Sequence, residues 1–149
     1  MMDDSKYMEL AIEEAKKAYD LDEVPIGAVV VLDGEVVGRG HNEKETRQDA
    51  TAHAEILALR QAMEKLGAWR LTGAVLYVTI EPCVMCVGAL IQSRLARIVF
   101  GARDSKFGGV VSLHHLADDA RHNHRMEYTE GILADEARKL MQDFFKAKR

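Results

Sequence analysis

A β-hairpin signal in the first quarter of the chain constrains the fold more than any other local feature. Residues 28–32 read Ala-Val-Val-Val-Leu, a mostly β-branched run that favours an extended strand. The pair Asp33-Gly34 follows, and it suits the positive φ angles of a type I′ turn. Residues 35–39 are expected to return as a second strand, so the first two strands form an antiparallel pair.

Helices and strands alternate around this hairpin. A first helix is expected over residues 6–19, capped by Ser5 or Asp4. The other elements are expected, in chain order, as a loop over 40–50, a helix from 51 or 52 to 66, a strand over 74–79, a helix over 82–93, a strand over 96–101, a short helix over 112–117, a strand over 126–129 and a helix over 134–146. This order predicts an α/β protein with a mixed five-stranded sheet and helices on both faces. The length of 149 residues predicts one domain over residues 1–149.

Charge and hydropathy limit what the chain can bind. The formal net charge is −4, which argues against broad, nonspecific binding of nucleic acid. Basic side chains nevertheless gather at Arg94, Arg97, Arg103, Lys106, Arg121 and Arg125, and again at Lys146, Lys148 and Arg149. A local basic surface and an ordinary solvated face both fit this distribution. No apolar run is long enough to cross a bilayer, and residues 1–20 have the pattern of an amphipathic helix rather than of a signal peptide, so we expect a cytoplasmic protein.

Two short motifs carry the chemistry. His53-Ala54-Glu55 stands at the predicted start of one helix, and Pro82-Cys83-Val84-Met85-Cys86 at the predicted start of the next. Zinc favours neutral imidazole nitrogen and thiolate sulfur as ligands. The three side chains His53, Cys83 and Cys86 would leave a fourth position for water, as in catalytic zinc sites. Glu55 can border the same cavity and exchange a proton with that water.

Each half of this pattern has other interpretations. A thioredoxin-type cysteine pair needs no partner histidine, and the tryptophan and glycine that usually flank it are missing here. A structural zinc site would need a fourth protein ligand. The candidates for that ligand are His41, His114, His115, His122 and His124, none of which has tight ligand spacing to another. Glu55 could also be a solvated glutamate at a helix N-terminus.

The two motifs together resemble those of the zinc deaminases that act on cytidine or adenosine, in which H-x-E is followed by P-C-x-x-C. Further blocks narrow the resemblance. They are Glu-Val-Pro-Ile-Gly-Ala-Val at 23–29, Leu-Tyr-Val-Thr at 76–79, Ser-Arg at 93–94, Val-Phe-Gly-Ala-Arg-Asp at 99–104, Asn-His-Arg at 123–125, Glu-Gly-Ile-Leu-Ala-Asp-Glu at 130–136 and Phe-Phe at 144–145. Over nearly its whole length the chain is similar to the bacterial tRNA-specific adenosine deaminases, within the cytidine/deoxycytidylate deaminase superfamily.

The resemblance implies a fold, a reaction and a set of partners. The fold is the three-layer α/β/α arrangement of cytidine deaminases. The reaction is hydrolytic conversion of the wobble adenosine of an arginine tRNA anticodon to inosine, with attack of a zinc-activated hydroxide on C6. His53, Cys83 and Cys86 would hold one Zn²⁺ per chain, and Glu55 would shuttle the proton. The chain would act on the tRNA anticodon loop as a homodimer.

The resemblance also assigns substrate contacts. Asn42 matches a residue that reads the purine, and Ile26 matches an apolar wall of the pocket, although a turn role and a core role fit these residues as well. Asp104 matches an acid near the nucleotide backbone. Lys106, Arg121, Arg125 and Lys148 are candidate phosphate contacts on charge grounds alone. Phe144 or Phe145 could stack on an anticodon base, and our choice is Phe145.

Two departures from the family pattern bear on the substrate. Ala50 stands where proline often precedes Thr51, and Phe107 replaces a small or polar residue after Lys106. A deaminase of a free nucleobase or nucleoside, of the guanine or cytosine type, shares the metal motifs and remains an alternative. A noncatalytic protein with a structural zinc is a second alternative.

Overall fold

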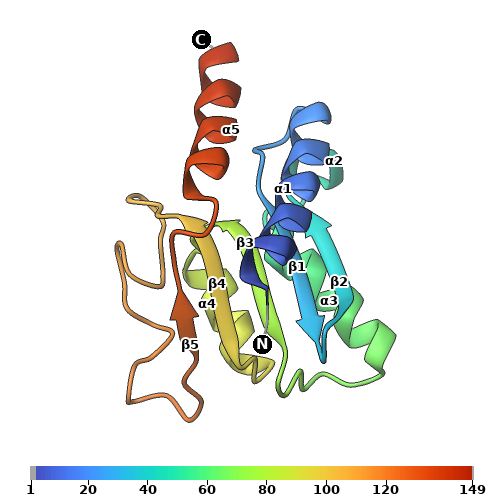
Figure 1. The fold of residues 1–149 in the computed structure, drawn as a ribbon, viewed down its shortest axis with the longest axis vertical. Coiled ribbons are helices and arrows are strands. Elements are labelled where there is room, and N and C mark those ends of the chain that lie inside the picture. Colours follow the sequence, from blue (N-terminus) through green and yellow to red (C-terminus); the bar gives the residue numbers. More distant parts are fainter. Residues whose placement is uncertain (1–2, 149) are drawn as a thin grey trace.

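Five strands form one mixed sheet in the computed structural model, which describes residues 3–148. The strands are β1 (Gly27–Leu32), β2 (Glu35–His41), β3 (Val75–Ile80), β4 (Arg97–Ala102) and β5 (Glu127–Thr129), and they lie in the order β2-β1-β3-β4-β5 (Figure 1). β1 runs antiparallel to both β2 and β3, whereas β3, β4 and β5 run parallel to one another. The predicted mixed five-stranded sheet is confirmed.

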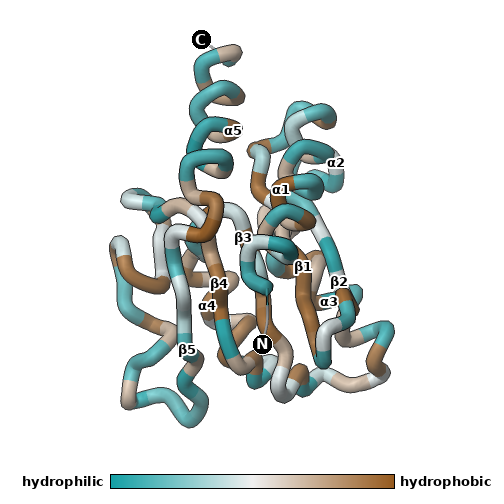
Figure 2. The backbone as a smooth tube through the Cα atoms, in the orientation of Figure 1, coloured by the Kyte–Doolittle hydropathy of each residue, from teal (hydrophilic) through white to brown (hydrophobic). Residues whose placement is uncertain are grey.

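The hairpin that opens the sheet has the expected turn. Asp33 and Gly34 both have positive φ angles, of 51° and 77°, as a type I′ turn requires. Side chains of β1 then alternate between the two faces of the sheet, so that Val29 and Val31 join one apolar cluster and Val30 joins another. β1 is therefore buried on both faces, and Figure 2 shows it as a continuous hydrophobic segment.

Four long helices cover the two faces of the sheet. α1 (Asp4–Asp20) and α5 (Ala134–Ala147) pack on one face and contact each other, and α3 (Ala54–Leu66) and α4 (Val84–Gln92) pack on the other. The three-layer α/β/α arrangement is thus confirmed (Figure 1). α5 extends well beyond the sheet at the end where β3 and β4 finish. Within residues 3–148, every helix is too short or too polar to span a bilayer.

The predicted short helix over residues 112–117 is wrong. This segment is a chain of turns, because its backbone N–H groups have partners that a helix cannot supply. The N–H of Ser112 donates to the Glu81 carboxylate, and the N–H groups of Leu113 and Leu116 donate to the carbonyls of Gly108 and Gly109. Tertiary contacts outweigh the local helical preference of this segment.

A one-turn helix, α2 (Lys44–Arg47), lies inside the segment expected to be a loop. A buried carboxylate, Glu23, holds it in place. The N–H groups of Glu45 and Thr46 donate to Glu23 at 3.2 and 2.6 Å, and the Thr46 hydroxyl donates at 2.6 Å. Because Glu23 is 21 residues or more away in sequence, no local pattern predicts this helix.

Candidate active site

The two sequence motifs meet at the end of the sheet where β3 finishes. His53 is the N-cap residue of α3 and Cys83 is the N-cap residue of α4, so each lies just before its helix rather than inside the predicted opening turn. Neither side chain caps its own helix, so both are available to face the space between the two helix ends. The Nδ1 atom of His53 lies 3.6 Å from Cys83 Sγ and 3.5 Å from Cys86 Sγ.

These three residues fit a zinc ion. Their ligand atoms all lie within 4.8 Å of one another, which allows simultaneous coordination of one ion. One imidazole nitrogen and two thiol sulfurs form a donor set that zinc favours. Among residues 3–148 this is the one group of three or more histidine, cysteine or acidic side chains that comes together in this way. Three protein ligands in place of four indicate a catalytic rather than a structural site.

The histidines considered as a fourth ligand lie elsewhere or have other partners. His41 Nδ1 contacts Glu14 Oε1 at 3.0 Å, and His124 Nε2 contacts the carbonyl of Leu95. None of the five candidate histidines is in the group that includes His53, within the residues that the structure describes. The structural-zinc interpretation therefore lacks its required ligand in this part of the chain.

The environment of the two cysteines favours deprotonation of one thiol and hence metal binding. A hydrogen bond from Cys86 lowers the pKa of the Cys83 thiol to about 4, and the same contact together with burial raises the pKa of Cys86. Coordination requires both sulfurs as thiolates, so metal binding releases a proton from this pair. The N-terminus of α4 favours the thiolate forms electrostatically.

Glu55 lies in the first turn of α3, beside the ligand group. Its side chain is only 4% exposed, and burial raises the pKa of its carboxyl to about 7. His53 and Cys86 are its charged and polar neighbours. A carboxyl at this position is shielded from bulk water yet borders the same cavity as His53 and Cys83, as a proton-transfer group must.

A cavity of about 580 Å³ opens over this group. Its size is within the range of small-molecule and nucleotide sites. Five of the substrate residues predicted from the sequence lie in its lining, namely Ile26, Asn42, Asp104, Lys106 and Phe145. Asn42 is buried. The Asp104 carboxylate also forms its own turn, because it accepts hydrogen bonds from the N–H groups of Lys106 and Phe107 at 3.0 and 3.2 Å.

Several lining residues had not been predicted. They include Val24, Lys44, Ile80, Arg103, Ser105, Phe107, Arg138 and Met141. Arg138, Met141 and Phe145 are spaced at i, i+3 and i+7 on α5, so they share one face of that helix. The spacing alone does not identify a cavity wall, because the same period also describes the apolar side by which α5 packs on the sheet.

The two neighbouring phenylalanines of α5 have different environments. Phe144 is 7% exposed and stacks edge-on against Tyr19, with ring centroids 5.8 Å apart. Phe145 is 46% exposed and lines the cavity. Of the two candidates for contacting a base, Phe145 is therefore the one at the cavity.

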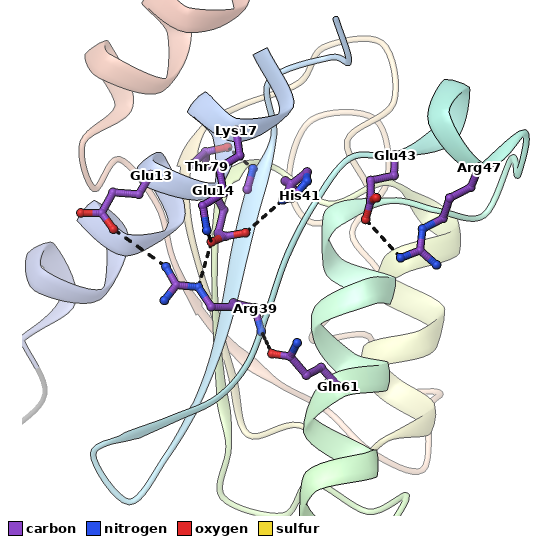
Figure 3. A network of polar contacts seen from close by, with 10 residues as sticks. Glu13, Glu14, Lys17, Arg39, His41, Glu43, Arg47, Gln61 and Thr79 are labelled. Atoms are coloured by element: carbon purple, nitrogen blue, oxygen red, sulfur yellow. Dashed lines mark hydrogen bonds and ion pairs between the residues drawn. The ribbon is translucent and has the colours of Figure 1, made fainter. Parts of the chain in front are cut away.

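A network of polar contacts braces the wall that carries Asn42. Glu14 of α1 is 3% exposed, and it accepts hydrogen bonds from Lys17 Nζ at 2.7 Å and Arg39 Nε at 2.8 Å while contacting His41 (Figure 3). Arg39 and His41 belong to β2, whose last residue directly precedes Asn42. The network thus fixes the end of β2 against α1.

Comparison with known proteins identifies the family. Residues 2–149 match the MafB19-like deaminase family. A tRNA-specific adenosine deaminase of Bacillus subtilis is 48% identical over 149 residues, which are 100% of this chain and 92% of that relative. The chain belongs to the tRNA-specific adenosine deaminase family. A structure solved in a study of A-to-I editing by tRNA:A34 deaminases at the wobble position is 44% identical, with a TM-score of 0.87 over 91% of this chain and 98% of that one.

The fold extends to deaminases of free purine bases. The guanine deaminase from Nitrosomonas europaea has a TM-score of 0.83 at 25% identity, over 97% of this chain and 85% of that enzyme. The present chain therefore shares its architecture with a guanine deaminase and with tRNA-specific deaminases. Its sequence identity is higher with the tRNA-specific deaminases.

The basic residues predicted from charge alone divide into two groups in this deaminase. Lys106 lines the cavity, together with Lys44, Arg103 and Arg138. Arg121, Arg125 and Lys148 are not in the lining. Arg121 pairs with Asp119 at 2.7 Å, and Lys148 pairs with Asp22 at 2.5 Å.

Proposed function

We propose that this protein is a zinc-dependent hydrolase that converts adenosine to inosine at the wobble position of an arginine tRNA anticodon. The observation that carries the proposal is a single cavity lined by His53, Cys83 and the buried carboxyl of Glu55, with Cys86 completing the group of candidate metal ligands. The 48% identity over the full chain to a protein named tRNA-specific adenosine deaminase supports tRNA as the substrate over a free base.

His53, Cys83 and Cys86 would hold one zinc ion. Bound zinc supplies Lewis-acid chemistry that brings the pKa of water down to near 7. The overall reaction replaces the 6-amino group of adenine with an oxygen from water and releases ammonia. Two thiolates and a neutral imidazole balance the charge of the ion, so the protein must supply a separate group to move protons.

Glu55 is that group. It would take one proton from the attacking water and deliver it to N1 of the purine, then take the second proton from the new hydroxyl group at C6 and pass it to the amino group, which departs as ammonia. Its burial keeps bulk solvent from competing for the proton, and its place in the first turn of α3 keeps it beside His53. A glutamate that is not a metal ligand has this role in zinc deaminases generally.

The remaining lining residues would bind the nucleotides. The target base must leave the anticodon stack to reach the cavity, and a loop allows this at a lower cost than a duplex does. Asn42 would hydrogen-bond the purine edge, Ile26 would pack against its face, and Phe145 would stack on a neighbouring base. Lys106 and the turn formed by Asp104 would contact the backbone near the target. Four basic side chains around the cavity, of which Arg103 and Arg138 are paired with Glu130 and Asp135, would supply local positive charge for a short loop on a chain with a net charge of −4.

The protein would act as a homodimer. α4 contains no charged residue, yet Val84 and Met85 on it are exposed, and Trp69 and Leu66 near the end of α3 are also exposed. These exposed apolar side chains are candidates for contacts with another chain. Sedimentation should show a dimer at micromolar concentration, and a monomer there would contradict the proposal.

The substrate is tested by incubation with arginine tRNA that carries an ACG anticodon, followed by detection of inosine at the wobble position. The matched control is the same tRNA with guanosine at that position. Guanine and cytidine are assayed in parallel for release of ammonia. Inosine in the tRNA with no turnover of the free compounds supports the proposal. Ammonia from guanine or cytidine with an unmodified tRNA would overturn it in favour of a free-base or nucleoside deaminase.

A further inference from the structure

Glu81, the residue after β3, is a buried carboxylate that the chemistry described so far does not use. Its side chain is 3% exposed and lies two residues before Cys83. All of its hydrogen-bond donors come from one segment, residues 104–112, which follows β4 and is called here the 104–112 loop. The first part of this loop, from Asp104 to Phe107, lines the cavity.

The carboxylate gathers donors from both ends of the loop. Oε1 accepts from the N–H of Asp104 at 3.0 Å and from the hydroxyl of Ser112. Oε2 accepts from the N–H groups of Val110, Val111 and Ser112 at 3.0, 2.8 and 3.0 Å. The Glu81 side chain thereby holds the two ends of the loop together, because it binds both Asp104 and Ser112.

The loop is also pressed against the cysteine motif. Cys83 and Gly108 form an isolated bridge, and the N–H of Gly109 donates to the carbonyl of Pro82 at 2.7 Å. A Cβ atom at Gly108 would collide with the Glu81 carboxylate, and one at Gly109 would lie 3.1 Å from the backbone of Cys83. The glycines at these two positions allow the close approach.

We infer that Glu81 is a positioning residue, which sets the substrate-binding face of the 104–112 loop at a fixed distance from the metal-ligand group. Its neighbours explain why a carboxylate is needed. Four backbone N–H groups and one hydroxyl converge on two oxygens, and only an ionised carboxylate accepts at both of them. The same residue is joined through Pro82 to the ligand Cys83, so the loop and the metal group share one anchor.

This inference predicts a specific kinetic defect in Glu81→Gln. The amide has the same shape, but its NH₂ group would face N–H donors at one end of the loop. The loop would have to be ordered again each time substrate binds. The KM for tRNA should therefore rise about tenfold or more, in line with the value of hydrogen bonds to charged groups, while kcat should stay within about threefold. The zinc content should be unchanged, because no metal ligand is altered.

Amide hydrogen exchange provides a readout that does not depend on activity. In Glu81→Gln the amides of Asp104, Val110, Val111 and Ser112 should exchange about tenfold faster or more. Amides within β3 should exchange as in the wild type. The milder variant Ser112→Ala removes one donor to Glu81 and should shift the same amides and the KM in the same direction by a smaller factor.

The matched control is Asp4→Asn, which alters a half-buried carboxylate far from the cavity. Asp4 accepts hydrogen bonds from Arg97 at 3.1 and 2.6 Å and from Tyr77 at 2.8 Å, so its loss should lower global stability without changing the KM. The kinetic half of the inference rests on the proposed tRNA substrate. If the wild type does not modify tRNA, the proposed function fails, and the exchange data alone decide the role of Glu81.

Three results would overturn the inference. Unchanged exchange of the loop amides in both Glu81→Gln and Ser112→Ala would show that Glu81 does not hold the loop. Faster exchange spread evenly over the loop and β3 would show a general stabilising role, as expected of Asp4. Loss of zinc from Glu81→Gln would show that the residue acts on the metal group instead.

Discussion

Phe144 and Phe145 provide an adjacent pair of substitutions with opposite expected effects. Phe144 is 7% exposed and packs against Tyr19, so Phe144→Ala should cost about 3 kcal/mol, the low end for removal of a buried phenylalanine. For a chain of this length that loss corresponds to a fall in Tm of roughly 6–12 °C. The kcat/KM measured well below this lowered Tm should change little.

Phe145→Ala should leave stability nearly unchanged and lower kcat/KM. The ring is 46% exposed, so its removal should change stability by about 0.5 kcal/mol, the usual range for surface substitutions. Loss of a stacked base costs about 1–3 kcal/mol, which is roughly 5- to 150-fold in kcat/KM for tRNA. Thermal unfolding and initial rates of inosine formation measure the two effects separately. A Phe145→Ala variant with a strongly lowered Tm and an unchanged kcat/KM would refute the assignment of Phe145 to the RNA.

Three further predictions concern the metal, an ion pair and a close contact. A zinc chelator should abolish inosine formation and lower the Tm, because an ion that binds only the folded state at 1,000 times its Kd adds about 4 kcal/mol; an unchanged Tm after complete removal of the metal would contradict this. Hydrogen bonds from Arg97 lower the pKa of Asp4 in the folded protein, against the opposing effect of burial. The Asp4–Arg97 pair therefore stabilises the fold fully at pH values above the unfolded pKa of 3.8. This stabilisation is lost as the pH falls through the lower pKa of the folded state. Asp4→Asn should therefore lose stability at about pH 7 and much less at about pH 2 in urea unfolding, and equal losses at both values would exclude this linkage. Gly38→Ala should destabilise the protein by about 1–3 kcal/mol, because its Cβ would collide with the backbone carbonyl oxygen of Ala58 and lie 2.9 Å from Ala62 N on α3; a wild-type Tm would show that β2 and α3 are less tightly packed.

The sequence predicts those parts of the fold that local chemistry determines. Asp33-Gly34 forms the expected turn because its preference for positive φ acts within two residues. The group His53, Cys83 and Cys86 is predictable because zinc restricts its ligands to a few residue types at short spacing. The position of β1 between β2 and β3 depends on pairings between distant strands, and the sequence pattern does not encode it directly.

The missed elements share one physical cause. Glu23 and Glu81 are buried carboxylates that collect backbone N–H groups from segments more than 20 residues away. Glu23 produces α2 in a segment expected to be a loop, and Glu81 binds Ser112, the first residue of the segment expected to be a helix over 112–117. Each carboxylate supports one wall of the cavity. The errors in the sequence-based prediction therefore lie at the segments that shape the candidate site.

The most direct test of the account is the effect of Glu55→Gln on inosine formation and on metal content. The substitution keeps the size of the side chain but removes its ability to transfer a proton. With zinc still bound at one ion per chain, turnover of arginine tRNA should fall by about 100-fold or more, the usual contribution of a general acid-base group. Near wild-type turnover in the zinc-loaded variant would show that Glu55 is not the proton shuttle and would contradict the account.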